Sequence, residues 1–106
     1  MVEQPGINTE NIRNSYFANI SAMLAQAKRY PKRAVRRKQE GTVKVNLVID
    51  RNGELVSFDI TQSSRHRVLD REVERMIQRS APFPEIPVAI AGNTLSITVP
   101  VAFFLR

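Results

Sequence analysis

Three stretches of the chain alternate apolar residues with polar or small ones, which is the period of a half-buried β-strand. They are residues 42–50, 56–61 and 95–103. Asn52-Gly53 lies between the first two stretches, and this dipeptide tolerates the positive φ angles of tight hairpin turns. We therefore expect a hairpin of two antiparallel strands and a third strand at the end of the chain.

Two other stretches have apolar residues at intervals of three and four, which is typical of amphipathic helices. They are residues 9–28 and residues 68–79. A further short helix is expected over residues 31–39, because Pro31 suits a first helical position and Gly41 lies where a helix-ending glycine belongs.

These elements predict an α+β fold in which a three-stranded antiparallel sheet has two main helices packed on one face. The other face of the sheet is expected to stay largely open. Residues 1–8 are expected to form a flexible lead-in and residues 9–106 the domain, with an extended connection through the prolines of residues 82–87. The expected core comprises Ile20, Met23, Leu24, Val43, Val45, Leu47, Phe58, Ile60, Leu69, Val73, Ile77, Ile97, Val99, Val101 and Phe103.

The last strand contains Pro100, which has no backbone N–H to donate to a neighbouring strand. A proline inside a strand indicates a sheet edge, and the backbone groups of successive residues point to opposite sides of the strand. The residues expected to share the outward orientation of Pro100 are Ser96, Thr98 and Ala102, whereas Ile97, Val99 and Val101 are expected to bond inward. Such an edge is either shielded or accepts a strand from another chain.

Positive charge is concentrated in one part of the sequence. The formal net charge is +6, yet residues 28–38 contain seven basic and no acidic residues, while the remaining positions hold nine basic and ten acidic ones. The basicity is therefore a local patch on an otherwise balanced domain. The chain has no cysteine, which excludes disulfides and thiolate metal sites, and we expect neither a transmembrane helix nor a signal peptide within it.

A series of short landmarks occurs in a fixed order along the chain. They are Tyr30-Pro31 with Ala34, Glu40-Gly41-Thr42-Val43, Ile49-Asp50 with Gly53, Ser63-Ser64, Leu69-Asp70, and Val99-Pro100-Val101 with Phe103 and Leu105. In order and spacing they resemble the C-terminal domain of TonB-family energy transducers, over about residues 16–106. One position departs from the family pattern, since Arg65 stands where a glycine often follows the two serines.

The resemblance implies a periplasmic domain of Gram-negative bacteria, tethered by a proline-rich linker and an inner-membrane helix, both absent here, to a motor of the ExbB and ExbD type. Such domains bind outer-membrane transporters for iron chelates or cobalamin by pairing their last strand with an extended segment, the TonB box. In this chain the part of the last strand expected to pair with the TonB box is residues 96–102. The resemblance also implies the strand order second, first, terminal, and no cofactor.

The basic patch allows more than one interpretation. In one interpretation, the patch is simply the solvated face of a short helix. In the other, Lys32, Arg33 and Arg36 touch a transporter or another acidic partner. Tyr30 and Pro31 are expected to be structural anchors. Anionic membranes and peptidoglycan would attract the same charges. Nucleic-acid binding is the alternative function, although an aromatic-rich strand, a helix-turn-helix spacing and a Gly-x-x-Gly loop are all missing from the sequence.

Catalytic chemistry is not expected. His66 is the only histidine, so neither a two-histidine metal site nor a histidine-based triad with a second base can form within the chain. Ser63-Ser64 lacks the glycines of a nucleophile elbow and is expected to close a turn or cap a helix. The sequence thus predicts an interaction domain and not an enzyme.

Overall fold

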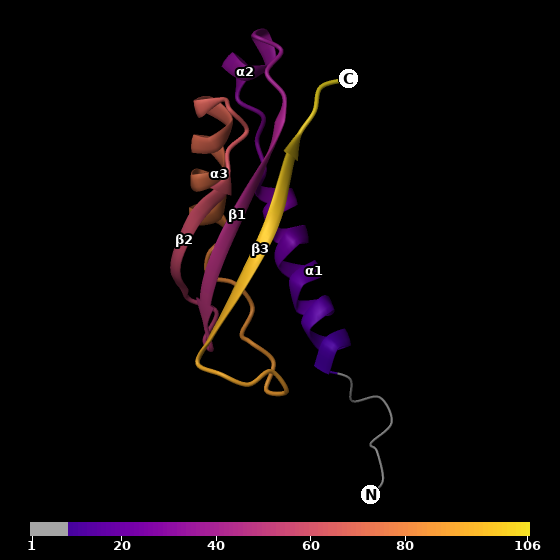
Figure 1. Ribbon diagram of the computed structural model, residues 1–106, viewed down its shortest axis with the longest axis vertical. Helices are drawn as coiled ribbons and strands as arrows, with labels where there is room; N and C mark the ends of the chain where they lie inside the picture. Colours follow the sequence, from indigo (N-terminus) through magenta and orange to yellow (C-terminus); the bar gives the residue numbers. More distant parts are fainter. Residues whose placement is uncertain (1–8) are drawn as a thin grey trace, which may run out of the picture.

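The structure, a computed structural model, describes residues 9–106 (Figure 1). The predicted lead-in of residues 1–8 lies outside the described residues. The elements follow in the order α1 (Thr9–Ala27), α2 (Lys32–Arg36), β1 (Gly41–Asp50), β2 (Leu55–Gln62), α3 (Arg67–Ser80) and β3 (Thr94–Phe103). Each lies within a few residues of the range that the hydrophobic pattern predicts.

The three strands form one antiparallel sheet with the order β2-β1-β3. This confirms the predicted α+β fold and the position of the terminal strand at an edge. The two long helices pack on the same face, with α1 on the β3 side and α3 on the β2 side (Figure 1). No helix within residues 9–106 is long and apolar enough to cross a membrane.

The core lies between the sheet and these two helices. Alternate residues of β1 are completely buried, namely Val43, Val45, Leu47 and Ile49, because strand alternation directs them all to the helix side. Most of the predicted core is confirmed. The prediction is wrong for Met23, Phe58, Ile60 and Ile97, which are only partly buried and pack against the core. The last three lie on the outer strands β2 and β3, each of which has a neighbouring strand on one side only.

The connection of residues 81–93 adds to the core, which the sequence pattern did not indicate. Three of its apolar side chains, Phe83, Ile86 and Ile90, are buried although the segment has no regular structure, whereas Val88 is exposed. Arg51 holds the segment in place, since its guanidinium donates hydrogen bonds to four backbone carbonyls between residues 86 and 92, at 2.6–3.3 Å.

Gly53 fixes the β1–β2 turn against that connection. Its φ is +88°, and a Cβ at this position would lie 2.0 Å from the carbonyl oxygen of Phe83. Gly53 also accepts a hydrogen bond of 2.8 Å from the backbone N–H of Phe83. Only glycine satisfies both the dihedral angle and the close approach.

Two backbone details differ from expectation. The left-handed residue after α2 is Lys38, with φ 54°, and not Gly41, which instead begins β1. Gly41 is needed for another reason, since a Cβ there would approach Ser64 to 3.0 Å. Arg65, which departs from the family pattern, is left-handed with φ 71°, so the chain keeps the local turn without the glycine.

Candidate functional site

The edge strand β3 contains all seven residues that the sequence predicts to bind a partner strand, Ser96 to Ala102. Ten successive pairs, from Gly41–Phe103 to Asp50–Thr94, join β1 and β3 without a shift of register. Pro100 lies opposite Lys44 and cannot donate, so this pair cannot exchange two hydrogen bonds. The carbonyl of Lys44 is instead directed toward β2, where it accepts a hydrogen bond of 3.2 Å from the hydroxyl of Thr61. The ladder to β1 therefore runs through Val99 and Val101, and the alternate residues of β3 face outward.

The carbonyl of Ala102 shows this outward direction. It accepts a hydrogen bond of 2.7 Å from the ammonium group of Lys28, which follows α1. The same ammonium lies 5.5 Å from the centre of the Phe103 ring. The outward groups left open are the backbone groups of Ser96 and Thr98, the carbonyl of Pro100 and the N–H of Ala102, since Lys28 occupies only the carbonyl of Ala102.

A small groove separates this edge from α1. Its volume is about 80 Å³, and its walls are formed by residues 99–102 of β3, by Met76, and by Ser21, Leu24, Ala25 and Lys28. The side chains that an incoming strand places opposite Val99 and Val101 would point toward this groove, because side chains of paired residues share a face of the sheet. The groove is as polar as it is apolar, and its volume suits one small side chain.

The segment between α1 and α2 is anchored on both sides. Tyr30 stacks edge-on against Phe103, with ring centres 5.4 Å apart, and its hydroxyl donates to the carbonyl of Gln39. The buried carboxylate of Glu72 pairs with Arg79 and accepts a hydrogen bond of 3.1 Å from the backbone of Arg29. These contacts support the structural role expected for Tyr30. The sequence placed Glu72 in a helix but did not indicate its contacts with Arg79 and Arg29.

The basic residues of α2 are exposed and lie at the end of the sheet where β1 begins and β3 ends (Figure 1). Lys32 and Arg33 line a crevice of about 370 Å³ together with Arg71 and Arg75 of α3, whereas Arg36 does not line it. No sequence pattern indicated that α2 and α3 lie side by side. Arg71 and Arg75 are four residues apart, which places both on one side of a helix, and this spacing could have indicated a basic surface on α3.

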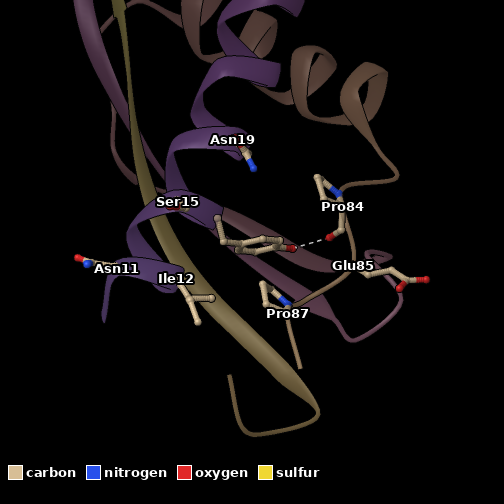
Figure 2. A pocket seen from close by; sticks show the side chains of 8 residues that line it. Asn11, Ile12, Ser15, Asn19, Pro84, Glu85 and Pro87 are labelled. Carbon is tan, nitrogen blue, oxygen red and sulfur yellow. Dashed lines mark hydrogen bonds between the residues drawn. The ribbon is translucent and has the colours of Figure 1, made fainter. Parts of the chain in front are cut away.

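A separate pocket of about 310 Å³ lies between the first half of α1 and the proline-containing connection (Figure 2). Ile12 and Asn19 line it from the helix, and Pro84 and Pro87 face them from the connection. The hydroxyl of Tyr16 closes its floor with a hydrogen bond of 2.8 Å to the carbonyl of Pro84. No histidine lines this pocket.

Ser63 and Ser64 close the turn before α3 and do not cap the helix. Both hydroxyls and the backbone N–H of Ser64 donate to the carboxylate of Asp70. Burial by itself would raise the pKa of Asp70, but the hydrogen bonds from the two serines and the nearby His66 outweigh it and hold the pKa below its usual value. Among residues 9–106, no three histidine, cysteine or carboxylate side chains form a group that could hold a metal ion.

The open face of the sheet is polar. The hydroxyls of Ser96 and Thr98 lie 2.9 and 3.3 Å from the amide oxygen of Asn46, and Lys44 is exposed beside them. Sheets that bind single-stranded RNA present aromatic rings on which bases stack. This part of the structure offers hydroxyl, amide and ammonium groups instead, so it gives no support to the nucleic-acid alternative.

Comparison with known proteins identifies relatives over most of the chain. The family model described as "Gram-negative bacterial TonB protein C-terminal" matches residues 26–105. Protein TonB of Pseudomonas putida is 34% identical over 83 residues, which are 77% of this chain and 34% of that protein. The chain thus spans about a third of the length of this curated relative.

Solved structures give the same result. The C-terminal domain of Helicobacter pylori TonB (residues 179–285 of that protein) has a TM-score of 0.76 at 24% identity, covering 96% of this chain and 87% of that one, which shows the shared fold. The C-terminal domain of HasB has a TM-score of 0.54 at 34% identity, covering 97% of this chain and 75% of that one.

Proposed function

The chain belongs to the family of Gram-negative bacterial TonB protein C-terminal domains, which are interaction domains and not enzymes, and from this membership we propose that its β3 edge binds outer-membrane transporters. The transporter contributes a TonB box, which pairs as a fourth strand with β3. The domain transmits energy from the proton-motive force in the uptake of iron chelates or cobalamin.

One observation supports this proposal above the others. The β3 edge is regular over ten residue pairs, and its single proline lies where the missing N–H falls on the outer side. An edge of this kind offers a row of backbone groups to an extended segment. The groove beside α1 supplies a place for one of its side chains.

The remaining parts of the proposal rest on the family. The domain lies in the periplasm, and a proline-rich linker and an inner-membrane helix outside this sequence connect it to a motor of the ExbB and ExbD type. The relative from Pseudomonas putida is about three times as long as the matching segment, which leaves room in that protein for such parts.

The affinity for a free TonB-box segment should be weak. Each backbone hydrogen bond of an added strand contributes roughly 0.5–1.5 kcal/mol net, whereas ordering each residue of a flexible segment costs ~1–2 kcal/mol. These terms nearly cancel, so useful binding depends on side-chain contacts and on the tethering of both partners. A weak contact suits a coupling that is made and released repeatedly.

Titration of the isotope-labelled domain with a TonB-box peptide tests the proposal. The amides of Ser96, Thr98 and Ala102 should shift most, while the amides of β2 should stay unchanged, and the affinity should be far weaker than nanomolar. Shifts confined to β2, or to the pocket of Figure 2, would show that the binding edge is wrongly assigned.

The exposed α2 residues Lys32, Arg33 and Arg36 are proposed to contact acidic groups of the transporter. Charges at the rim of an interface mainly tune the encounter rate and its salt dependence. Arg33→Glu should therefore slow association by about threefold or more at low salt, measured by stopped-flow or surface-based kinetics. Arg37→Glu is the matched control with the same charge change. An unchanged association rate for Arg33→Glu at low salt would remove this residue from the interface.

A further inference from the structure

Two crevices meet on the outer side of α3. The first, of about 370 Å³, is lined by Pro31, Lys32 and Arg33 beside α2 and by Val68, Arg71 and Arg75 of α3. The second, of about 350 Å³, is lined by Phe58 of β2 and by Arg71, Glu74, Arg75 and Gln78 of α3. Because both contain Arg71 and Arg75, they form one continuous surface from α2 across α3 to β2, which we call the arginine track.

The four cations of the arginine track, Lys32, Arg33, Arg71 and Arg75, have no internal partner. Within residues 9–106, the one ion pair joins Arg79 to Glu72, and no side-chain hydrogen bond involves any of these four cations. Arg71 and Arg75 are like charges four residues apart on a helix, an arrangement that is mildly destabilising. A bound anion would relieve this repulsion and satisfy guanidinium donors that otherwise face water.

The track also has apolar surface at both ends. Pro31 and Val68 are partly buried at the α2 end, and Phe58 is partly buried at the β2 end. Its one carboxylate, that of Glu74, lies beside Phe58 in the second crevice. Cations in the middle with apolar side chains at the ends match an acidic peptide that has an apolar residue. A uniform polyanion such as a nucleic acid would meet Glu74.

We propose that the arginine track is a second docking surface, which binds an acidic, extended protein segment with an apolar residue beside Phe58. The carboxylates of this segment pair with Arg71 and Arg75 and with Lys32 and Arg33. The track lies on the β2 side of the molecule, whereas the outer edge of β3 lies on the other side (Figure 1). A segment bound in the track therefore leaves the β3 edge free, and it occupies Lys32 and Arg33, which are the proposed rim contacts of the transporter.

Binding of a synthetic peptide to the 106-residue chain tests this proposal. The peptide contains several glutamates separated by glycines and ends in phenylalanine, and the matched peptide has glutamine at each glutamate. Arg71→Gln/Arg75→Gln should weaken binding of the acidic peptide about tenfold at low salt. The control Arg13→Gln/Arg37→Gln removes the same charge from exposed positions outside the track and should weaken it about twofold or less.

Three results would overturn the proposal. Equal losses in both double variants would mean general attraction to a basic domain, and equal affinity for the glutamine peptide would mean that carboxylates are not recognised. If anionic vesicles bind the chain through Arg71 and Arg75 but the acidic peptide does not bind it, the ligand of the track is a lipid surface and not a peptide. Thr98→Pro should bind the acidic peptide normally, so a failure of the β3 proposal is distinguishable from a failure of this one.

Discussion

The two outer strands of the sheet pair with β1 in different ways. β3 matches β1 residue for residue over ten pairs, whereas the register of β2 shifts between Lys44 and Val45 and again between Val48 and Ile49. Irregularities of this kind bend and twist a strand, and they are among the features that keep sheet edges from pairing with other chains. The β2 edge is therefore less suited to strand addition than the β3 edge.

The ends of β2 are also fixed more firmly. Gly53 holds the turn before β2 against the 81–93 connection, and Asp70 binds both serines of the turn after it. Beyond Pro100, the outer side of β3 is held by a single exposed lysine, Lys28. This difference indicates that β2 contributes mainly to folding and that the outer side of β3 is available for binding. Changes in the turns that flank β2 should therefore alter stability without altering binding at the β3 edge.

The largest change in stability is expected for Gly53→Ala. A methyl group at φ +88° and 2.0 Å from the Phe83 oxygen forces the turn away from the connection, at an expected cost of about 3 kcal/mol in the free energy of unfolding. Urea denaturation measures this loss. Gly92→Ala is the matched control, because its φ is also positive but its Cβ would meet only the Thr94 oxygen at 3.5 Å. Equal losses in the two variants would contradict the role of the close contact.

A smaller, pH-dependent loss is expected for Asp70→Asn. The pKa of Asp70 is lowered in the folded state, so its carboxylate stabilises the fold above the unfolded pKa near 3.8, and this contribution disappears as the pH falls through the lower folded pKa. At neutral pH the variant should lose about 1–2 kcal/mol through its weaker hydrogen bonds. Thermal melting as a function of pH should show the difference from the original chain shrinking in acid.

The control for this prediction is Asp59→Asn, an exposed carboxylate on β2 without a side-chain hydrogen bond in the described part of the chain. Its melting temperature should change little at any pH. A constant difference between Asp70→Asn and the original chain from neutral to acid pH would show that the ionised carboxylate does not stabilise the turn.

The smallest effect is expected for Arg65→Gly. Arg65 is left-handed with φ 71°, and glycine removes the steric cost of that conformation while losing more backbone entropy, for a net gain of up to about 1 kcal/mol. Arg65→Ala removes the charge but keeps the Cβ, so it should show no gain. A destabilised Arg65→Gly variant in chemical denaturation would mean that the arginine side chain itself supports the turn.

The sequence predicted the elements and the edge position of the terminal strand well, because both depend on local patterns. Pro100 alone indicated an edge and which backbone groups face outward. The buried connection was missed, because a segment with three prolines has no period that distinguishes buried from exposed residues, and the four carbonyl contacts of Arg51 depend on the folded chain. The arginine track was missed for a similar reason, since α2 and α3 meet only in the folded domain.

The most direct test of the outer side of β3 as the binding edge compares proline substitutions at neighbouring positions of this strand. Thr98→Pro removes an outward N–H, whereas Val99→Pro removes an N–H that bonds to β1. Circular dichroism and thermal melting report folding, and transport coupling together with TonB-box binding reports function. Thr98→Val keeps the backbone donor and controls for the lost hydroxyl, which lies 3.3 Å from Asn46.

Thr98→Pro is expected to fold but to be impaired in both binding and coupling. Val99→Pro is expected to be unfolded or severely destabilised. Thr98→Val is expected to behave like the original chain. An unfolded Thr98→Pro variant, or a folded one that binds and couples normally, would contradict the assignment of the outer side of β3 as the binding edge.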